Sequence, residues 1–287
     1  YKPKDTYRIA GGKSNRNKLT EGENLDNGVI TYFNIPTYTE NDEVSLTYLN
    51  TNRDTIVSFG TKLKEKKKLN VKKGANKFAW NMYYDGASDF KGMVLWWASL
   101  SGPKAVPGNY YVDLNVNGEV ISKSFNILID PRSESSVLNM QEQFNFITSI
   151  NQTVDKSHKS IKKIRNIKNH LSKFITEYSE NDVKDLIDKA SVLEGKLSAI
   201  EKELYQTQNR SGQDPLNFPI RLTNKLAHLN SLVSMGDFQP TIQDIQVKEF
   251  LVQEIKKSLE SFDVLMENEI ISFNTLFNAN NLNYIIT

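Results

Sequence analysis

The sequence predicts an α+β protein of two parts, an antiparallel β-sandwich followed by an antiparallel four-helix bundle. Three observations support this fold class. Before residue 130, short alternating or β-branched runs are separated by turn signals, as they are in sandwiches. After Asp130-Pro131-Arg132, apolar residues recur every three or four positions, as they do in helices. The 287 residues are also enough for two domains of ordinary size.

The strand-like runs occupy the first part of the chain, where we place an Ig-like β-sandwich at residues 20–130. Residues 1–19, with the polar stretch Gly11–Asn15, are expected to be a linker or edge segment. Asn117-Gly118 lies between two alternating runs and is the strongest short-range hairpin signal. Gly92–Ala98 is the most apolar stretch and is expected to be a buried strand. The expected strands are 28–35, 44–49, 55–59, 76–84, 93–97, 109–116 and 120–129.

Residues 131–287 are expected to form the helical bundle. In the first helix, apolar residues recur at a mean step of about 3.5, the period of a left-handed bundle seam. Ser179 with Asp182, and Thr241 with Asp244, have the spacing of helix N-caps. The helices are expected at 140–178, 179–204, 222–233 and 241–273.

All three tryptophans lie in one aromatic-rich stretch, residues 78–114. Such a cluster can stack sugars or bases, or it can form a protein core. Because adjacent strand residues face opposite sides, we expect one of Trp96 and Trp97 in the core and the other outward or at the domain junction. Packing is favoured, and a ligand platform is the alternative. The candidate ligand-binding residues are Trp80, Tyr83, Tyr84, Trp96 and Trp97.

No residue pattern has the spacing of a metal site, so we expect no metal ion and no cofactor. Asp85 and Asp89 fit no complete calcium loop. The histidines are expected to be packing or surface residues, because no Glu-x-x-His pair accompanies them. They are His158, His170 and His228.

We also expect no catalytic residue, and therefore no enzymatic activity of this chain. Asp182, Asp185 and Asp188 share one helix face, where a solvated surface is favoured over a carboxylate pair for glycoside hydrolysis. Nucleophile elbows, phosphate loops and metal-binding helix motifs are missing from the sequence.

Charge and composition exclude further classes. The net charge of +2 gives no general attraction to nucleic acid or anionic membranes. The lysine run 62–73 is expected to be a solvated or charged edge. With no cysteine, the chain has neither disulfides nor thiolate zinc sites. No apolar stretch reaches the roughly 18 residues of a membrane span. Because Tyr1 is not an initiator methionine, we expect a fragment or a processed product.

Several motifs follow one another in an order that carries a family resemblance. They are Trp80–Tyr84, Gly92–Trp96, Gly102–Tyr111, Asp130-Pro131-Arg132, Pro219–Leu226 and Gly236–Thr241. This order resembles the C-terminal region of large exported Bacteroidota proteins whose N-terminal part is a sortilin-like β-propeller with BNR/Asp-box repeats. The sandwich is also similar to the Ig-like domain of the flagellar hook-cap family, which shares the Val-Pro-Gly-x-Tyr turn.

The resemblance implies a non-catalytic accessory module that braces the propeller of a parent protein or docks another cell-envelope protein. It also implies export, to the periplasm, the outer-membrane surface or the extracellular space. The alternative is a carbohydrate-binding module that uses exposed aromatic residues of the sandwich, or part of a glycoside hydrolase whose active site lies outside this chain. Proteins of this kind are often labelled glycosyl hydrolases by analogy with sialidases, but that label transfers no residue, because this chain contains no Asp-box. Asp54-Thr55-Ile56 matches the short O-glycosylation pattern of such exported proteins, which makes Thr55 a candidate modification site.

Overall fold

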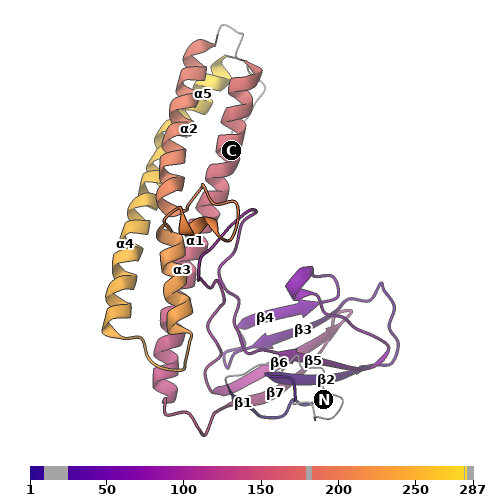
Figure 1. Ribbon diagram of the computed structural model, residues 1–287. Coiled ribbons are helices and arrows are strands. Elements are labelled where there is room, and N and C mark those ends of the chain that lie inside the picture. The colour runs from indigo at the N-terminus through magenta and orange to yellow at the C-terminus, as the bar shows by residue number, and fades with distance from the viewer. Residues whose placement is uncertain (10–24, 179–182, 281, 283–287) are drawn as a thin grey trace. The chain divides into compact units, whose positions relative to one another are not determined.

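A computed structural model describes residues 1–9, 25–178, 183–280 and 282. The chain divides into two compact units, which we describe separately. Unit 1 contains residues 1–86, 101–146 and 236–239, and unit 2 contains residues 87–100, 147–235 and 240–287. All strands of the described residues lie in unit 1, and most of the helical residues lie in unit 2 (Figure 1). The protein therefore mixes α and β elements, as the sequence predicts.

Five strands of unit 1 form one sheet in the order β1-β7-β6-β3-β4. β6 and β7 form the expected hairpin, and the turn residues Asn117 and Gly118 have φ angles of 53° and 97°, as a type I′ turn requires. β1 pairs in parallel with β7, so the sheet is not purely antiparallel. The strands are β1 (Thr6–Arg8), β3 (Val44–Leu49), β4 (Thr55–Gly60), β6 (Gly108–Val116) and β7 (Glu119–Ile129).

β1 shows that part of the segment 1–19 is an edge strand, whereas Gly11–Asn15 lies outside the described residues. β2 (Val29–Ile35) and β5 (Gly74–Trp80) form a second, antiparallel sheet. Alternate residues of β2 are buried, as the period of two requires for a strand with one face in a core.

The two sheets share one apolar core. At its centre Trp80 of β5 stacks on Tyr48 of β3 with ring centroids 4.6 Å apart, and Phe125 of β7 meets both rings edge-on. Trp80 is 1% exposed. The tryptophan of β5 is therefore a core residue, in keeping with the packing interpretation of the aromatic stretch.

The expected strand at Gly92–Ala98 is wrong. These residues have no strand structure, and they belong to unit 2 with the helices. The residues of this run are half-buried or exposed on a loop, and apolarity alone does not distinguish such a segment from a buried strand.

The helices follow the apolar periodicity of the sequence, and α1 is 41 residues long. The expected cap at Ser179 and Asp182 lies outside the described residues, and the described part of α2 begins at Lys184. Thr241 caps α4 as expected, in a capping box with Asp244. The helices are α1 (Val137–Glu177), α2 (Lys184–Leu204), α3 (Leu222–Val233), α4 (Ile242–Val264) and α5 (Ile271–Ala279), and a π-helical turn, Leu265–Ile270, joins the last two.

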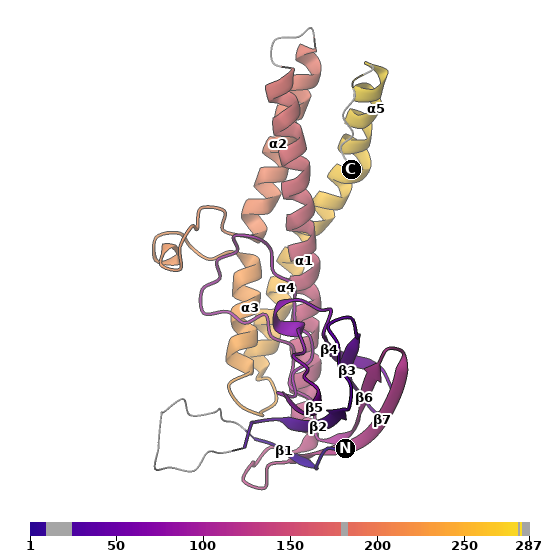
Figure 2. The same ribbon diagram turned by 90° about the vertical axis from the view of Figure 1, so that its right-hand side faces the viewer.

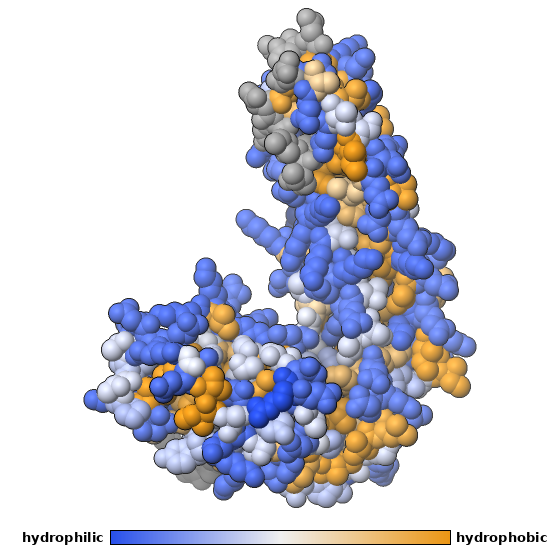
Figure 3. Space-filling view, turned by 180° about the vertical axis from the view of Figure 1, so that it is seen from behind, coloured by the Kyte–Doolittle hydropathy of each residue, from blue (hydrophilic) through white to orange (hydrophobic). Residues whose placement is uncertain are grey.

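The core of unit 2 is formed by residues of α1, α2, α4 and α5, such as Ile164, Leu193 and Phe273. Some apolar side chains of α4 point outward instead: Ile242 is 69% exposed and Phe250 is 61% exposed. Figure 3 shows hydrophobic surface on the helical unit among many hydrophilic side chains. Of the helices in the described part of the chain, none combines the length and the apolar character needed to cross a membrane.

Candidate functional site

Residues Ala87–Leu100 form a loop, and the chain segments that enter and leave it pair with each other in a short stem. The N–H of Ala105 donates to the Met82 carbonyl at 2.7 Å, and the N–H of Ala87 donates to the Leu100 carbonyl at 2.9 Å. Gly102 allows the two sides of the stem to approach closely, because a Cβ there would lie 2.2 Å from the Tyr84 carbonyl oxygen. The loop beyond the stem lies against the helices of unit 2 (Figures 1 and 2).

Side chains of α1, and that of Tyr205 just after the end of α2, bind the backbone of this loop at several points along its length. At its start, the N–H of Ser88 donates to Asp155 at 3.0 Å, and Nδ1 of His158 contacts the Ser88 carbonyl at 2.6 Å. Farther along, the N–H of Val94 donates to the Tyr205 hydroxyl at 2.8 Å. A loop without strand or helix pairing must satisfy its buried backbone groups in another way, and these side chains do so.

The side chain of Phe90 makes apolar contacts between the same loop and other residues of unit 2. Its ring is 7% exposed and meets His158 edge-on at 5.1 Å and Tyr205 edge-on at 4.9 Å. The Arg165 guanidinium lies 4.6 Å from the centroid of the Phe90 ring. Aromatic packing and a cation–π contact therefore add to the hydrogen bonds of the loop.

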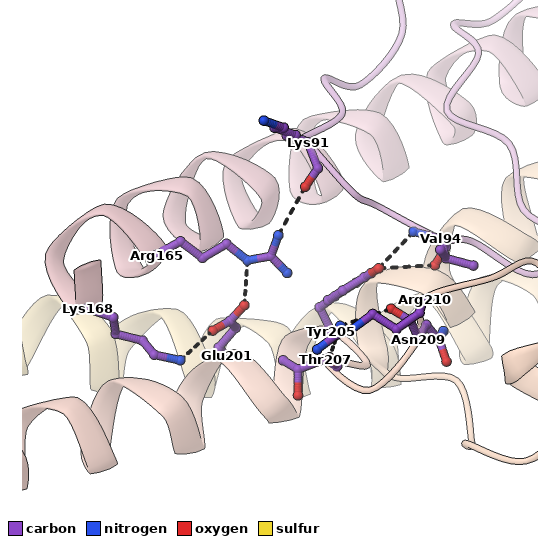
Figure 4. A network of polar contacts seen from close by, with 9 residues as sticks. All are labelled: Lys91, Val94, Arg165, Lys168, Glu201, Tyr205, Thr207, Asn209 and Arg210. Carbon is purple, nitrogen blue, oxygen red and sulfur yellow. Dashed lines mark hydrogen bonds and ion pairs between the residues drawn. The ribbon is translucent and has the colours of Figure 1, made fainter. Parts of the chain in front are cut away.

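A buried carboxylate, that of Glu201, lies beside the Arg165 guanidinium (Figure 4). Glu201 of α2 is 3% exposed, and it accepts hydrogen bonds from Arg165 at 2.6 Å and Lys168 at 3.0 Å, both on α1. Arg165 also donates to the Lys91 carbonyl at 3.3 Å. Two cations on one buried carboxylate form an ion-pair network that joins α1 and α2.

The loop ends in a tryptophan pair whose backbone is bound by α3. The Asn224 side chain accepts from the Trp96 N–H at 2.8 Å and donates to the Trp96 carbonyl at 2.9 Å. Nδ1 of His228 contacts the Trp97 carbonyl at 2.5 Å. After the pair, the Ser99 N–H donates to the Ala227 carbonyl at 3.0 Å. The polypeptide is thus bound on both sides of Trp97.

Trp97 itself points into solvent. It is 73% exposed, whereas Trp96 is half-buried, and the two rings lie 6.3 Å apart with an angle of 33° between them. The φ angle of Trp97 is 49°, in the left-handed region that costs a non-glycine residue roughly 1–2 kcal/mol. The structure therefore holds a large apolar ring outside the core on a strained backbone, and backbone strain of this kind clusters at functional sites.

The α3 surface beside this pair is mixed in character. Lys225, His228 and Leu232 follow one another at three- and four-residue spacing, so they lie along one face of the helix. Lys225 is exposed and Leu232 is 46% exposed. With Trp97, this face offers an aromatic ring, an aliphatic side chain, a cation and an imidazole.

The other candidate ligand-binding residues lie in unit 1. Trp80 is enclosed in the core, and its indole N–H donates to the Tyr83 carbonyl at 3.0 Å. Tyr83 is 37% exposed. Tyr84 is half-buried against Phe144, with centroids 4.8 Å apart, and burial raises the pKa of its hydroxyl. Only Tyr83 of these three has a substantially exposed ring, and Trp96 and Trp97 lie in the other unit.

The residues considered as metal ligands are dispersed. Asp85 forms an ion pair with Lys67 in unit 1, whereas Asp89 is exposed on the loop in unit 2. Over the ranges that the structure describes, no group of three or more histidine, aspartate or glutamate residues could hold a metal ion. Asp185 and Asp188 are exposed on α2, and Asp182 lies outside the described residues.

Sequence reasoning singled out Trp97 but missed the residues that present it. Asn224 and His228 are more than 120 positions away in the chain, as the separations of 128 and 131 residues show. Asn224 lies on the buried side of an amphipathic helix, at 4% exposure, and a buried amide among leucines is the one signal that could have drawn attention to it.

Comparison with known proteins adds no relative. No family model, no curated protein and no solved structure matches this chain.

Proposed function

We propose that this chain is a non-catalytic recognition module and that Trp97 is its principal contact residue. The observation that supports the proposal is the exposed Trp97 ring on a backbone that Asn224 and His228 hold in a left-handed conformation. Exposed tryptophans that are rigidly held form hot spots in binding interfaces, because they offer a large contact area at little entropic cost.

The order of motifs supports a wider setting for the module. We propose that it accompanies a sortilin-like, Asp-box β-propeller in an exported protein, braces that propeller or docks a cell-envelope partner, and itself performs no catalysis. In this account unit 1 is an Ig-like sandwich, supported by two sheets that share one core, and the helices form a four-helix bundle. Asp-box repeats encoded directly upstream of Tyr1 would support this setting, and a different domain there would contradict it.

Replacing Trp97 by a photo-crosslinking phenylalanine derivative tests the recognition role. We expect illumination of cells that make this variant to yield a discrete crosslinked product of higher mass. The same derivative at Tyr7, which is 50% exposed in unit 1, serves as the control and should not yield that product. Equal labelling from both positions, or none from position 97 together with no glycan binding, would overturn the proposal.

Carbohydrate binding is the second candidate, because an exposed indole beside polar groups suits the apolar face of a sugar ring. On a glycan array, binding that Trp97→Ala abolishes would support this function. Binding that survives Trp97→Ala but is lost with Tyr83→Ala would move the site to unit 1.

Thr55 is exposed at the start of β4, which suits the proposed O-glycosylation, and mass spectrometry of the native protein tests it.

A further inference from the structure

The outer edge of β7 is longer than the strand that pairs with it. β7 extends over Glu119–Ile129, but β1 pairs only with residues 127–129. At the next position, the Asn126 N–H donates to Asp5 at 3.0 Å. In the described part of the chain no strand pairs with this edge between residues 119 and 125. An open edge of this kind is a template for another strand.

The hairpin fixes which backbone groups face outward along this edge. A two-residue turn makes Val116 and Glu119 a hydrogen-bonded pair, so the odd-numbered residues of β7 bond to β6. The N–H and C=O groups of the even-numbered residues Val120, Ser122 and Ser124 then point away from β6. The outward N–H of Asn126, which bonds to Asp5, agrees with this alternation.

The side chains of the open edge have a distinctive order. Glu119, Ile121 and Lys123 are exposed and share the sheet face that carries buried Phe125 and Ile127 farther along. Ile121 is 59% exposed and Val120 is 56% exposed. The edge therefore has an apolar residue between an acid and a base, at equal spacing on one face.

We propose that the β7 edge is a self-association surface, on which β7 of a second copy of this chain pairs antiparallel around a two-fold axis at Ile121. In that register Ile121 meets Ile121 of the second copy, and Glu119 lies opposite Lys123 twice. The outward N–H and C=O groups of Val120 then bond to those of Ser122 of the second copy. Both residues face outward, so they can form a hydrogen-bonded antiparallel pair. Opposite charges and apolar side chains directly across a strand pair stabilise it.

Neighbouring registers do not have this complementarity. An axis at Ser122 places Ile121 against Lys123, and an axis at Lys123 places the two lysines against each other. Of these three axes, only the one at Ile121 places Glu119 opposite Lys123 twice and places the two Ile121 side chains opposite each other. The order of Glu119, Ile121 and Lys123 thus makes this edge complementary to itself in one register. This favours a second copy of the chain over an arbitrary strand as its partner.

Sedimentation of the full chain over a concentration series tests this proposal. We expect a concentration-dependent dimer for the wild type. Lys123→Glu and Glu119→Lys each place like charges opposite one another, so each should weaken dimerisation about tenfold or more. The double variant Glu119→Lys/Lys123→Glu restores both charge pairs in reverse and should restore the dimer.

Mixing the two single variants is the sharpest arm of the test. Each should be mainly monomeric alone, but a mixture should form heterodimers, because two lysines on one chain then face two glutamates on the other. Lys66→Glu, the same charge change on a 3-10 turn of unit 1, is the control and should leave dimerisation unchanged. A wild type that stays monomeric to about 1 mM, or a dimer indifferent to these charges, would overturn the proposal.

Discussion

Asn224 of α3 binds both backbone polar groups of Trp96, accepting from its N–H at 2.8 Å and donating to its carbonyl at 2.9 Å. A side-chain amide is the natural group for this task, because it carries one acceptor and two donors. The contact joins residues 128 positions apart in the chain and fixes the direction in which the next residue, Trp97, leaves the surface.

Replacing Asn224 by alanine should destabilise the protein. The two backbone groups of Trp96 would lose their partner, at a cost of about 1–3 kcal/mol in the free energy of unfolding. Urea denaturation followed by circular dichroism measures this. Asn217→Ala, at an exposed position before α3, is the matched control and should change the free energy by less than about 0.5 kcal/mol. Equal effects of the two substitutions would contradict the assigned role.

Trp80 and Trp97 should respond differently to truncation. Trp80→Ala leaves a large cavity in the core of unit 1 and should cost about 3–5 kcal/mol. Trp97→Ala removes an exposed ring and should cost less than about 1 kcal/mol. Denaturation of each variant compares them. A large loss for Trp97→Ala would mean that its ring serves folding and not recognition.

Glu201 should be needed in its charged form. Glu201→Gln removes a buried carboxylate that accepts from both Arg165 and Lys168, so we expect a loss of about 1.5–3 kcal/mol. Glu203→Gln, on the exposed side of the same helix, is the control and should be nearly neutral. Unfolding midpoints in urea distinguish the two, and a neutral result for Glu201→Gln would refute the ion-pair network.

Stability should fall as the pH drops below about 6.5, and His158 should be the cause. Burial has the largest influence on the pKa of His158 and lowers it. The charge of Lys162 lowers this pKa further, whereas the Ser88 carbonyl, Asp155 and Asp89 raise it, and the net shift is downward. The folded state then binds a proton at His158 less well than the unfolded chain does. The stability that neutral His158 contributes is therefore complete above the pKa of the unfolded state, and it is lost as the pH falls to the lower pKa of the folded state.

Denaturation at pH 7.5 and pH 5.5 separates this effect from the carboxylates. Burial raises the pKa of Asp155, but hydrogen bonds from Lys159 and Ser88 outweigh it and lower that pKa to about 2, so Asp155 loses its contribution only at more acidic pH. His158→Gln should remove most of the difference between the two conditions. A wild type with equal stability at both pH values would contradict the prediction.

Local signals predicted most of the elements. The Asn117-Gly118 turn and the Thr241–Asp244 cap depend on neighbouring residues, so their sequence patterns are reliable. Gly92–Ala98 was placed wrongly because an apolar run has the same pattern on a sheet and on helices. The contacts that decide its place, such as Val94 with Tyr205, are 111 residues apart in the chain.

The candidate site was predictable only in its exposed ring. A pair of adjacent tryptophans suggests that one faces outward, and Trp97 does so, although on a loop and not on a strand. The polar residues that hold it, Asn224 and His228, resemble ordinary members of an amphipathic helix in the sequence. Their role follows from tertiary packing, which no local pattern encodes.

Amide hydrogen exchange along the loop 87–100, followed by NMR on the full chain, tests whether the helices hold this loop and present Trp97. If helix side chains bind the loop and present Trp97, the amides of Ser88, Val94, Trp96 and Ser99 should be protected to a degree similar to those inside α3. Exchange of these four amides at the rate of an open peptide would contradict the account.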